Sequence, residues 1–486
     1  MHPILHVLVV GFHHTKGCQV EFCYPPFPNS KSAANPDTEL PSEWINLPSL
    51  VMPDQSHSTE SDTVYFTVPS LSNGNRTVFG IACYRQIDTQ SLISKKNDVT
   101  RSYVQKSVCV LSTVPLFGML REKLQLITQS YFEEKDFSKV EVLQQMYANL
   151  ADVFDTQSLD QQFAYMGVPL DSLLRIFKHR TLELLKLILL EKKVIFELHP
   201  TGILSDVIVG LISLFPCMIE SGLFESAVYS PSESNDESTK SSSNEHGFPL
   251  KIFTKRNLLF PYMSINGIDD LRNRNVRAYC IGVTNGIFKL NSDLYDVYVS
   301  MDQKGNGVIE YNDNELAQKL SLTTQDNRFM SNILKTVSDS SPAEFNGNDD
   351  WVAMQFYLYI CAMFNAASKN DEHMAEYNLE FIRLWKETEN YKEWSSETHE
   401  KLSQIDSSHP STGPISAQDF IALVGHQFHH FGRAHALPTL STTARYLSEK
   451  SGKLRTTFSS WINRSTSRSS TSGDVNAKKM NRNELI

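Results

Sequence analysis

The sequence has no hydrophobic run long enough to cross a lipid bilayer. A membrane-spanning helix needs about 20 mostly apolar residues, whereas the most apolar helical stretch, 182–190, is interrupted by Glu183 and Lys186. The first apolar stretch, 4–12, lacks a basic flank and a small-residue cleavage site, so we interpret it as a strand and not as a secretory signal. These absences predict a cytosolic protein.

Cysteine is scarce and shows no pattern. The 7 cysteines are an odd number and form no C-x-x-C pair, which is typical of a chain kept reduced in the cytosol.

The common motifs of catalysis and nucleotide binding are absent as well. The sequence contains no match to Walker A, G-x-S-x-G, H-E-x-x-H or G-x-G-x-x-G. Gly452-Lys453 is followed by Leu454, which has no hydroxyl to hold magnesium. We therefore expect no covalent chemistry, and we predict no catalytic residue, no cofactor and no metal site.

Two stretches resemble metal sites, and each has a simpler interpretation. Residues 302–313, DQKGNGVIEYND, resemble a calcium loop, but Lys304 occupies a ligand position and both flanks alternate like strands. They predict a β-hairpin that turns at 305–307. His426, His429 and His430 would share one face of a helix, but no second segment completes a ligand set, so we interpret them as solvated or capping residues.

The composition is that of a folded protein with an uneven charge. The 486 residues are 41% hydrophobic, which predicts about three domains with sizeable cores. Residues 445–486 contain nine basic and three acidic residues, a net charge of +6, so the remainder carries −16 of a total of −10. The acidic body argues against nucleic-acid binding, and the basic tail favours contact with an anionic surface.

The first part of the chain predicts an α+β lobe over residues 1–155. Alternating apolar residues indicate five strands, and the apolar period then changes to that of helices. The expected strands are 4–12, 17–24, 63–68, 77–87 and 107–111, and the expected helices are 116–131 and 140–154.

The middle part predicts an α/β domain over residues 165–312. We expect one long buried helix at 170–190, a strand at 194–198, a second buried helix at 205–215 and strands within 249–311. Between them, residues 226–247 contain SPSESNDESTKSSSNE, which has no apolar period and predicts a disordered insertion. A plain linker and a phosphorylation switch both remain open for it.

The last part predicts a helical region over 313–400 and a flexible basic tail over 401–486. The Met- and aromatic-rich stretch 351–367 is typical of a core helix, and 378–394 predicts another helix. In the tail, four apolar residues fall on one helical face and three cations flank them, as in an interfacial membrane helix. These candidate membrane-contact residues are Leu454, Phe458, Trp461 and Ile462 with Lys453, Arg455 and Arg464. Docking on the body and an unfolded segment are the alternatives.

Several separated segments resemble one known family in the same order. FPLKIFTKRNLLFPYMSI (248–265), VRAYCIGVTNGIF (276–288) and LYDVYVSMDQKGNGVIEY (294–311) resemble the central module of DENN proteins. VLVVGFHHTKGCQVEFCYPPF (7–27) and FIRLWKETENYKEW (381–394) resemble the Avl-type, late-secretory-pathway branch of that superfamily.

The resemblance implies a tripartite α/β and α+β protein with a longin-like N-terminal lobe, a central DENN domain and a helical C-terminal region. It also implies a Rab- or Arf-like small GTPase bound between the first two lobes, at Golgi-derived or recycling-endosome membranes. Guanine nucleotide exchange, which needs no covalent chemistry, and a non-enzymatic adaptor or effector scaffold are the two functions that follow.

Overall fold

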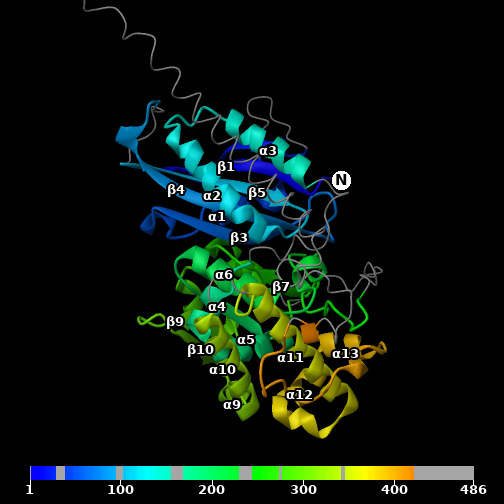
Figure 1. Cartoon of the computed structure of the whole chain (residues 1–486). Coiled ribbons are helices and arrows are strands. Elements are labelled where there is room, and N and C mark those ends of the chain that lie inside the picture. Colours follow the sequence, from blue (N-terminus) through cyan, green and yellow to red (C-terminus); the bar gives the residue numbers. More distant parts are fainter. Residues whose placement is uncertain are drawn as a thin grey trace, which may run out of the picture. The chain divides into compact units, whose positions relative to one another are not determined.

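The fold begins with an antiparallel sheet (Figure 1). In the computed structural model, the described residues are 2–28, 39–94, 102–154, 168–228, 243–272, 276–340, 345–416 and 418–420, all within the unit that spans 1–428. The strand order is β2-β1-β5-β4-β3, with every pair antiparallel. The strands are β1 (Ile4–His13), β2 (Gly17–Tyr24), β3 (Ser61–Pro69), β4 (Thr77–Asp88) and β5 (Tyr103–Ser112).

Helices complete this N-terminal lobe. The short α1 (Leu47–Val51), α2 (Phe117–Glu133) and α3 (Glu141–Val153) all pack on the sheet. In Figure 1, α2 and α3 run along the sheet together. The five strands and the two long helices confirm the predicted α+β arrangement.

A second sheet forms the centre of the chain. Its order is β10-β9-β6-β8-β7, parallel except for the antiparallel β9–β10 pair. The strands are β6 (Lys193–Glu197), β7 (Asn257–Phe260), β8 (Ala278–Val283), β9 (Val297–Met301) and β10 (Gly307–Tyr311). The helices that accompany them are α4 (Asp171–Phe177), α5 (Arg180–Leu189), α6 (Thr201–Ser213), α7 (Ile268–Leu271) and α8 (Ile287–Leu290).

The hairpin predicted at 302–313 is confirmed. β9 and β10 pair directly, and Gly305 takes the left-handed conformation at φ +82° that a tight turn requires. Gly307 has a different role, because a Cβ there would lie 2.3 Å from the Phe177 ring.

The single helix predicted at 170–190 is wrong. α4 ends at Phe177, Lys178 has φ 49° and ψ −124°, and α5 begins at Arg180. After the break, α4 packs on α6 and β10, and α5 contacts both α4 and α6. Similarly, the helix predicted at 378–394 is two helices, because the Thr388 side chain caps a new one by accepting from the Tyr391 N–H.

The remaining helices form the C-terminal region. α11 (Asp349–Lys369) is the central one, with its Met and aromatic side chains buried as predicted. Around it lie α10 (Thr324–Asp339), a 3-10 helix (Glu372–Tyr377), α12 (Leu379–Lys386) and α13 (Glu389–Ser395). α9 (Asn314–Lys319) packs against β10.

The tail predicted from residue 401 is wrong at its start. Residues 401–416, which we call the strap, lie across these helices, and Leu402 and Ile405 are each only 2% exposed. The α11 side chain of Gln355 exchanges two hydrogen bonds with the backbone of Ile415, at 3.0 and 2.9 Å. Polar α11 side chains therefore satisfy backbone groups of the strap.

A buried ion pair between α5 and α10 anchors the strap through a hydrogen bond to His409. Lys186 on α5 lies 2.6 Å from Asp326 on α10, and both side chains are 0% exposed. Asp326 also accepts hydrogen bonds from Tyr359 at 3.0 Å and from strap residue His409 at 3.1 Å. Burial by itself would raise the pKa of Asp326, but Lys186, His409 and the Thr323 N–H hold it well below its usual range.

The insertion predicted at 226–247 is described only at its two ends, and both ends are folded. Ser226, Ala227 and Val228 are buried, and the Ala227 N–H donates to Thr77 Oγ1 at 3.0 Å. His246 is also buried and accepts from Trp394 at 3.3 Å. Residues 229–242 lie outside the described part. Among the helices that are described, none combines the length and the apolar character that a bilayer span requires.

Candidate functional site

The N-terminal sheet meets the central domain along β3, a boundary that we call the seam. β3 is an edge strand, and it packs against α6 and β7. The Tyr65 N–H donates to Ser205 Oγ at 3.1 Å, and the Thr67 hydroxyl donates to the Leu259 carbonyl at 2.7 Å. The edge that would otherwise invite pairing with another chain is thus covered within the protein.

Asp62 at the start of β3 caps a helix of the other domain. Its carboxylate accepts from the N–H groups of Thr201 and Gly202, both at 2.8 Å. Pro200, the residue in the N-cap position, contributes no side-chain bond, so Asp62 satisfies the amides that begin α6. Burial raises the pKa of Asp62, against the opposing effect of these donors. A Cβ at position 202 would lie 2.8 Å from Asp62 Oδ1, so a larger residue there would displace the capping carboxylate.

An ion pair binds the same helix to α2. Arg121 lies 2.5 Å from Asp206, whose side chain is 8% exposed. Burial raises the pKa of Asp206, although Arg121 acts in the opposite direction. With Asp62, this pair ties α6 to the N-terminal lobe at two points about one helical turn apart.

A loop of the N-terminal lobe covers the carboxyl ends of the parallel strands. The Asp54 N–H donates to the Tyr262 hydroxyl at 2.8 Å, and the Thr284 hydroxyl donates to the Asp54 carbonyl at 3.1 Å. Tyr262 lies two residues after β7, and Thr284 directly follows β8. In open α/β sheets this edge is the usual place for ligands, and here a second lobe lies on it.

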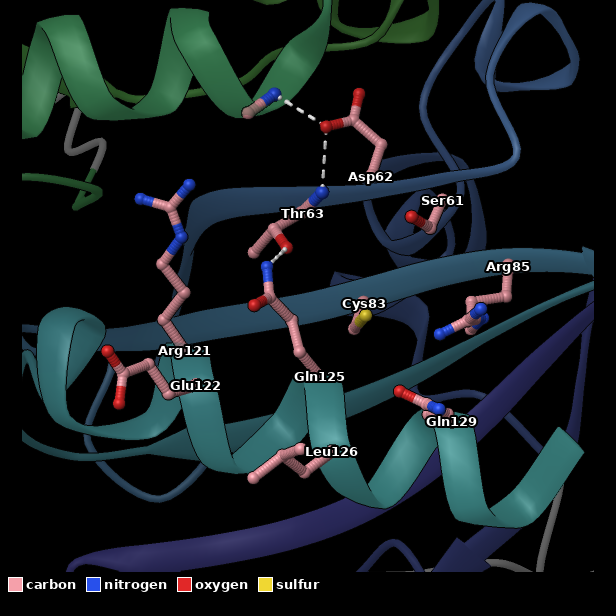
Figure 2. A pocket seen from close by; sticks show the side chains of 11 residues that line it. Ser61, Asp62, Thr63, Cys83, Arg85, Arg121, Glu122, Gln125, Leu126 and Gln129 are labelled. Carbon is pink, nitrogen blue, oxygen red and sulfur yellow. Dashed lines mark hydrogen bonds between the residues drawn. The ribbon is translucent and has the colours of Figure 1, made fainter. Parts of the chain in front are cut away.

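Two cavities lie on either side of Asp62. The larger has a volume of about 520 Å³ and is lined from β3, β4, α2 and α6. Figure 2 shows Asp62 next to α6, Cys83 and Arg85 on β4, and Gln125 on α2. The smaller, of about 240 Å³, is lined by residues 54–59 and by His199.

The larger cavity offers recognition groups and no activated nucleophile. Burial raises the pKa of Cys83 to about 11, so its thiol stays neutral at physiological pH. In the described ranges, no three His, Cys, Asp or Glu side chains gather as a metal-ligand set.

Apolar side chains are exposed in both domains that meet at the seam. Leu126, on the rim of the larger cavity, is 50% exposed. On α8, which follows shortly after Thr284, Ile287 and Leu290 are 43% and 84% exposed. Exposed apolar groups around a polar cavity are typical of a protein-binding surface.

The sequence predicted none of these residues. Asp62, Arg121 and Gly202 come from three separate elements and belong to no short motif. The predicted membrane-contact residues from Lys453 to Arg464 lie outside the described residues, as does the cluster around His426.

Comparison with known proteins places these observations in a family. The model of the family described as Transport protein Avl9 matches residues 4–367, which include both sheets and the seam. Late secretory pathway protein AVL9 of Saccharomyces cerevisiae is 31% identical over 464 residues, and the match covers 82% of this chain and 59% of that protein. Late secretory pathway protein avl9 of Schizosaccharomyces pombe is 30% identical over 434 residues, covering 83% and 88%. The chain therefore spans somewhat more than half of the budding-yeast relative.

Proposed function

The chain belongs to the Avl9 family of transport proteins, and from this premise we propose that it acts in membrane traffic of the late secretory pathway. We propose that it does so by binding a Rab- or Arf-like small GTPase at the seam. The names of its two relatives support the pathway. The resemblance of its segments to DENN modules supports the class of partner.

The observation that carries this proposal is the construction of the seam. Two lobes are held together by a helix cap, an ion pair and several hydrogen bonds. They leave a cavity of about 520 Å³ open beside Leu126. A rigid, partly polar surface with apolar groups around it suits recognition of a folded partner, because little ordering is needed on binding.

Nucleotide exchange is the activity that such a surface supports best. A protein that binds the nucleotide-free GTPase more tightly than the loaded form shifts the population toward nucleotide release. Expressed as a free energy, this shift is limited to the difference between the binding free energies of the two GTPase forms. No bond is made or broken by the exchange factor, so a neutral thiol at Cys83 is no obstacle.

The direct test is the release of a fluorescent guanine nucleotide from a panel of purified Rab and Arf-family GTPases. We expect saturable acceleration by the full chain for one or two members. Binding to a GTP-loaded member without acceleration would replace exchange with an adaptor or effector function. No binding to any member would contradict the proposal.

Seam variants connect the activity to this surface. Leu126→Asp places a charge on the exposed apolar position at the rim of the larger cavity, and we expect it to weaken GTPase binding at least tenfold. Ile93→Asp is the matched control, because Ile93 is 77% exposed and is not among the residues that line either cavity. Equal loss in both variants would exclude the seam as the binding surface.

We also propose where the protein acts. The basic tail, with segment 453–464, would hold it on the anionic cytoplasmic face of Golgi-derived or recycling-endosome membranes. The net charge of +6 over residues 445–486 supports this attraction.

A further inference from the structure

Arg85 lines the larger cavity of the seam and, within the described ranges, has no ion-pair, hydrogen-bond or ring partner, its one electrostatic neighbour being the neutral Cys83 thiol. It lies on β4, is half-buried and lines the cavity (Figure 2). Among the described residues, no carboxylate, carbonyl or ring contacts its guanidinium. Arg121, which lines the same cavity, is by contrast paired with Asp206.

Other arginines of the described part show how unusual this is. Eight of the other nine have an ion-pair, hydrogen-bond, ring or electrostatic partner. Arg328 has none, but its side chain is exposed. The eight are Arg76, Arg121, Arg175, Arg180, Arg256, Arg272, Arg277 and Arg383.

A half-buried arginine without an acceptor has lost part of its hydration without compensation. An incoming carboxylate would restore that loss with two parallel, charge-assisted hydrogen bonds. Arg85 is therefore prepared to bind an anion before the anion arrives.

The charges around the cavity select a carboxylate over a phosphate. Asp62 and Glu122 line the cavity together with Arg85 and Arg121, and the Asp206 carboxylate that pairs with Arg121 brings the formal charge around it to −1. Asp62 is occupied by N–H groups of β3 and α6, and Arg121 by Asp206. A carboxylate brings one negative charge to Arg85, whereas a dianionic phosphate brings two and is repelled more strongly by Asp62 and Glu122.

We infer that Arg85 determines specificity at the seam by binding an Asp or Glu side chain of the partner protein. Gln125 and Gln129 on α2, which line the same wall, supply polar contacts beside that carboxylate. The identity of the partner as a small GTPase rests on the proposed function, but the carboxylate assignment does not.

Arginine modification tests whether Arg85 binds a carboxylate, and it needs no partner protein. Phenylglyoxal is applied to the full chain, and peptide mass mapping follows the modification of Arg85 and Arg328 separately. We expect hexaglutamate to slow the modification of Arg85 at least fivefold and to change the modification rate of Arg328 by less than twofold. Hexaglutamine, which has no carboxylate side chains, is expected to protect neither arginine. Equal rates at Arg85 with and without hexaglutamate would overturn the inference. Protection by inorganic phosphate at lower concentration than by hexaglutamate would also overturn it.

The partner is tested with variants. Arg85→Gln is expected to weaken binding of the responsive GTPase at least tenfold, Arg85→Lys less, and Arg328→Gln not at all. An unchanged melting temperature of R85Q shows that the fold is intact. GTPase binding that is insensitive to R85Q would overturn the inference and leave the proposed function standing. If hexaglutamate protects Arg85 but no GTPase binds, the carboxylate inference stands and the proposed function is contradicted.

Discussion

At the scale of single residues, Asp62 makes one domain depend on the other. The first turn of α6 has no side-chain cap of its own, because Pro200 precedes it. The cap comes from a strand of the N-terminal lobe, at 2.8 Å to two successive amides. The correct start of α6, and with it the shape of both cavities, therefore requires the two lobes to be assembled.

Replacing Asp62 tests this dependence. We expect Asp62→Ala to lower the free energy of unfolding by about 1–2 kcal/mol, the usual effect of losing a helix cap. Asp62→Asn keeps an acceptor oxygen and is the matched control, with a smaller expected loss. Urea unfolding followed by circular dichroism measures both. If the alanine variant unfolds at the wild-type midpoint, the cap contributes nothing to stability.

Asp326 predicts how stability changes at low pH. Its pKa in the folded protein lies below the unfolded value of 3.8, so the folded state favours the ionised form. The resulting stabilisation is fully present above the unfolded pKa and is lost as the pH falls from about 4 toward the folded pKa. Asp326→Asn removes this dependence, although it is less stable at pH 7 because Lys186 loses its buried partner.

Urea midpoints of the wild type and of D326N, measured between pH 6 and pH 2.5, test that prediction. We expect the difference between the two proteins to shrink steadily below pH 4. A constant difference across the range would mean that Asp326 is not held in its ionised form by Lys186.

At the scale of elements, the sequence predicts regular structure where the pattern is local. All five strands of the first sheet and the β9–β10 hairpin follow from alternation and turn residues. The break between α4 and α5 does not, since Lys178 is neither glycine nor proline and its neighbours continue the apolar period. The reason for the break is tertiary, because α4 has to reach α6 and β10.

The residues of the candidate site are even harder to predict from the local sequence pattern. Asp62, Arg85, Gln125 and Gly202 belong to β3, β4, α2 and α6, and they meet only because β3 lies on α6. No spacing along the chain records that contact. A glycine at the start of a buried helix was the one visible signal, and Gly202 alone does not indicate what approaches it.

The strap predicts where a stable fragment must end. Gln355 on α11 and Asp326 on α10 bond to strap residues Ile415 and His409, so a chain ending at 400 would leave buried polar groups unsatisfied. We expect residues 1–400 to melt at least 5 °C below residues 1–420, which should match the full chain. Differential scanning fluorimetry of the three proteins gives the answer. Equal melting of the two fragments would show that the strap is dispensable.

At the scale of the whole molecule, opposite charges are separated along the chain. Residues 1–444 carry −16 and residues 445–486 carry +6. An anionic membrane repels the first part and attracts the second, by about 1 kcal/mol for each basic residue near the surface. The tail could equally be attracted to the acidic body, and the two attractions respond differently to deletion.

Deleting residues 440–486 separates the alternatives. We expect the full chain to co-sediment with vesicles of 30% phosphatidylserine in phosphatidylcholine, and the truncated chain to lose most of that binding. Within the full chain, Phe458→Ser with Trp461→Ser removes apolar contact and keeps the charge, so we expect weaker binding that salt still abolishes. Thr456→Ser with Ser459→Thr is the matched control. Truncated protein that binds as well as the full chain would move the membrane contact to the folded body, and the tail would then be an internal ligand of that body.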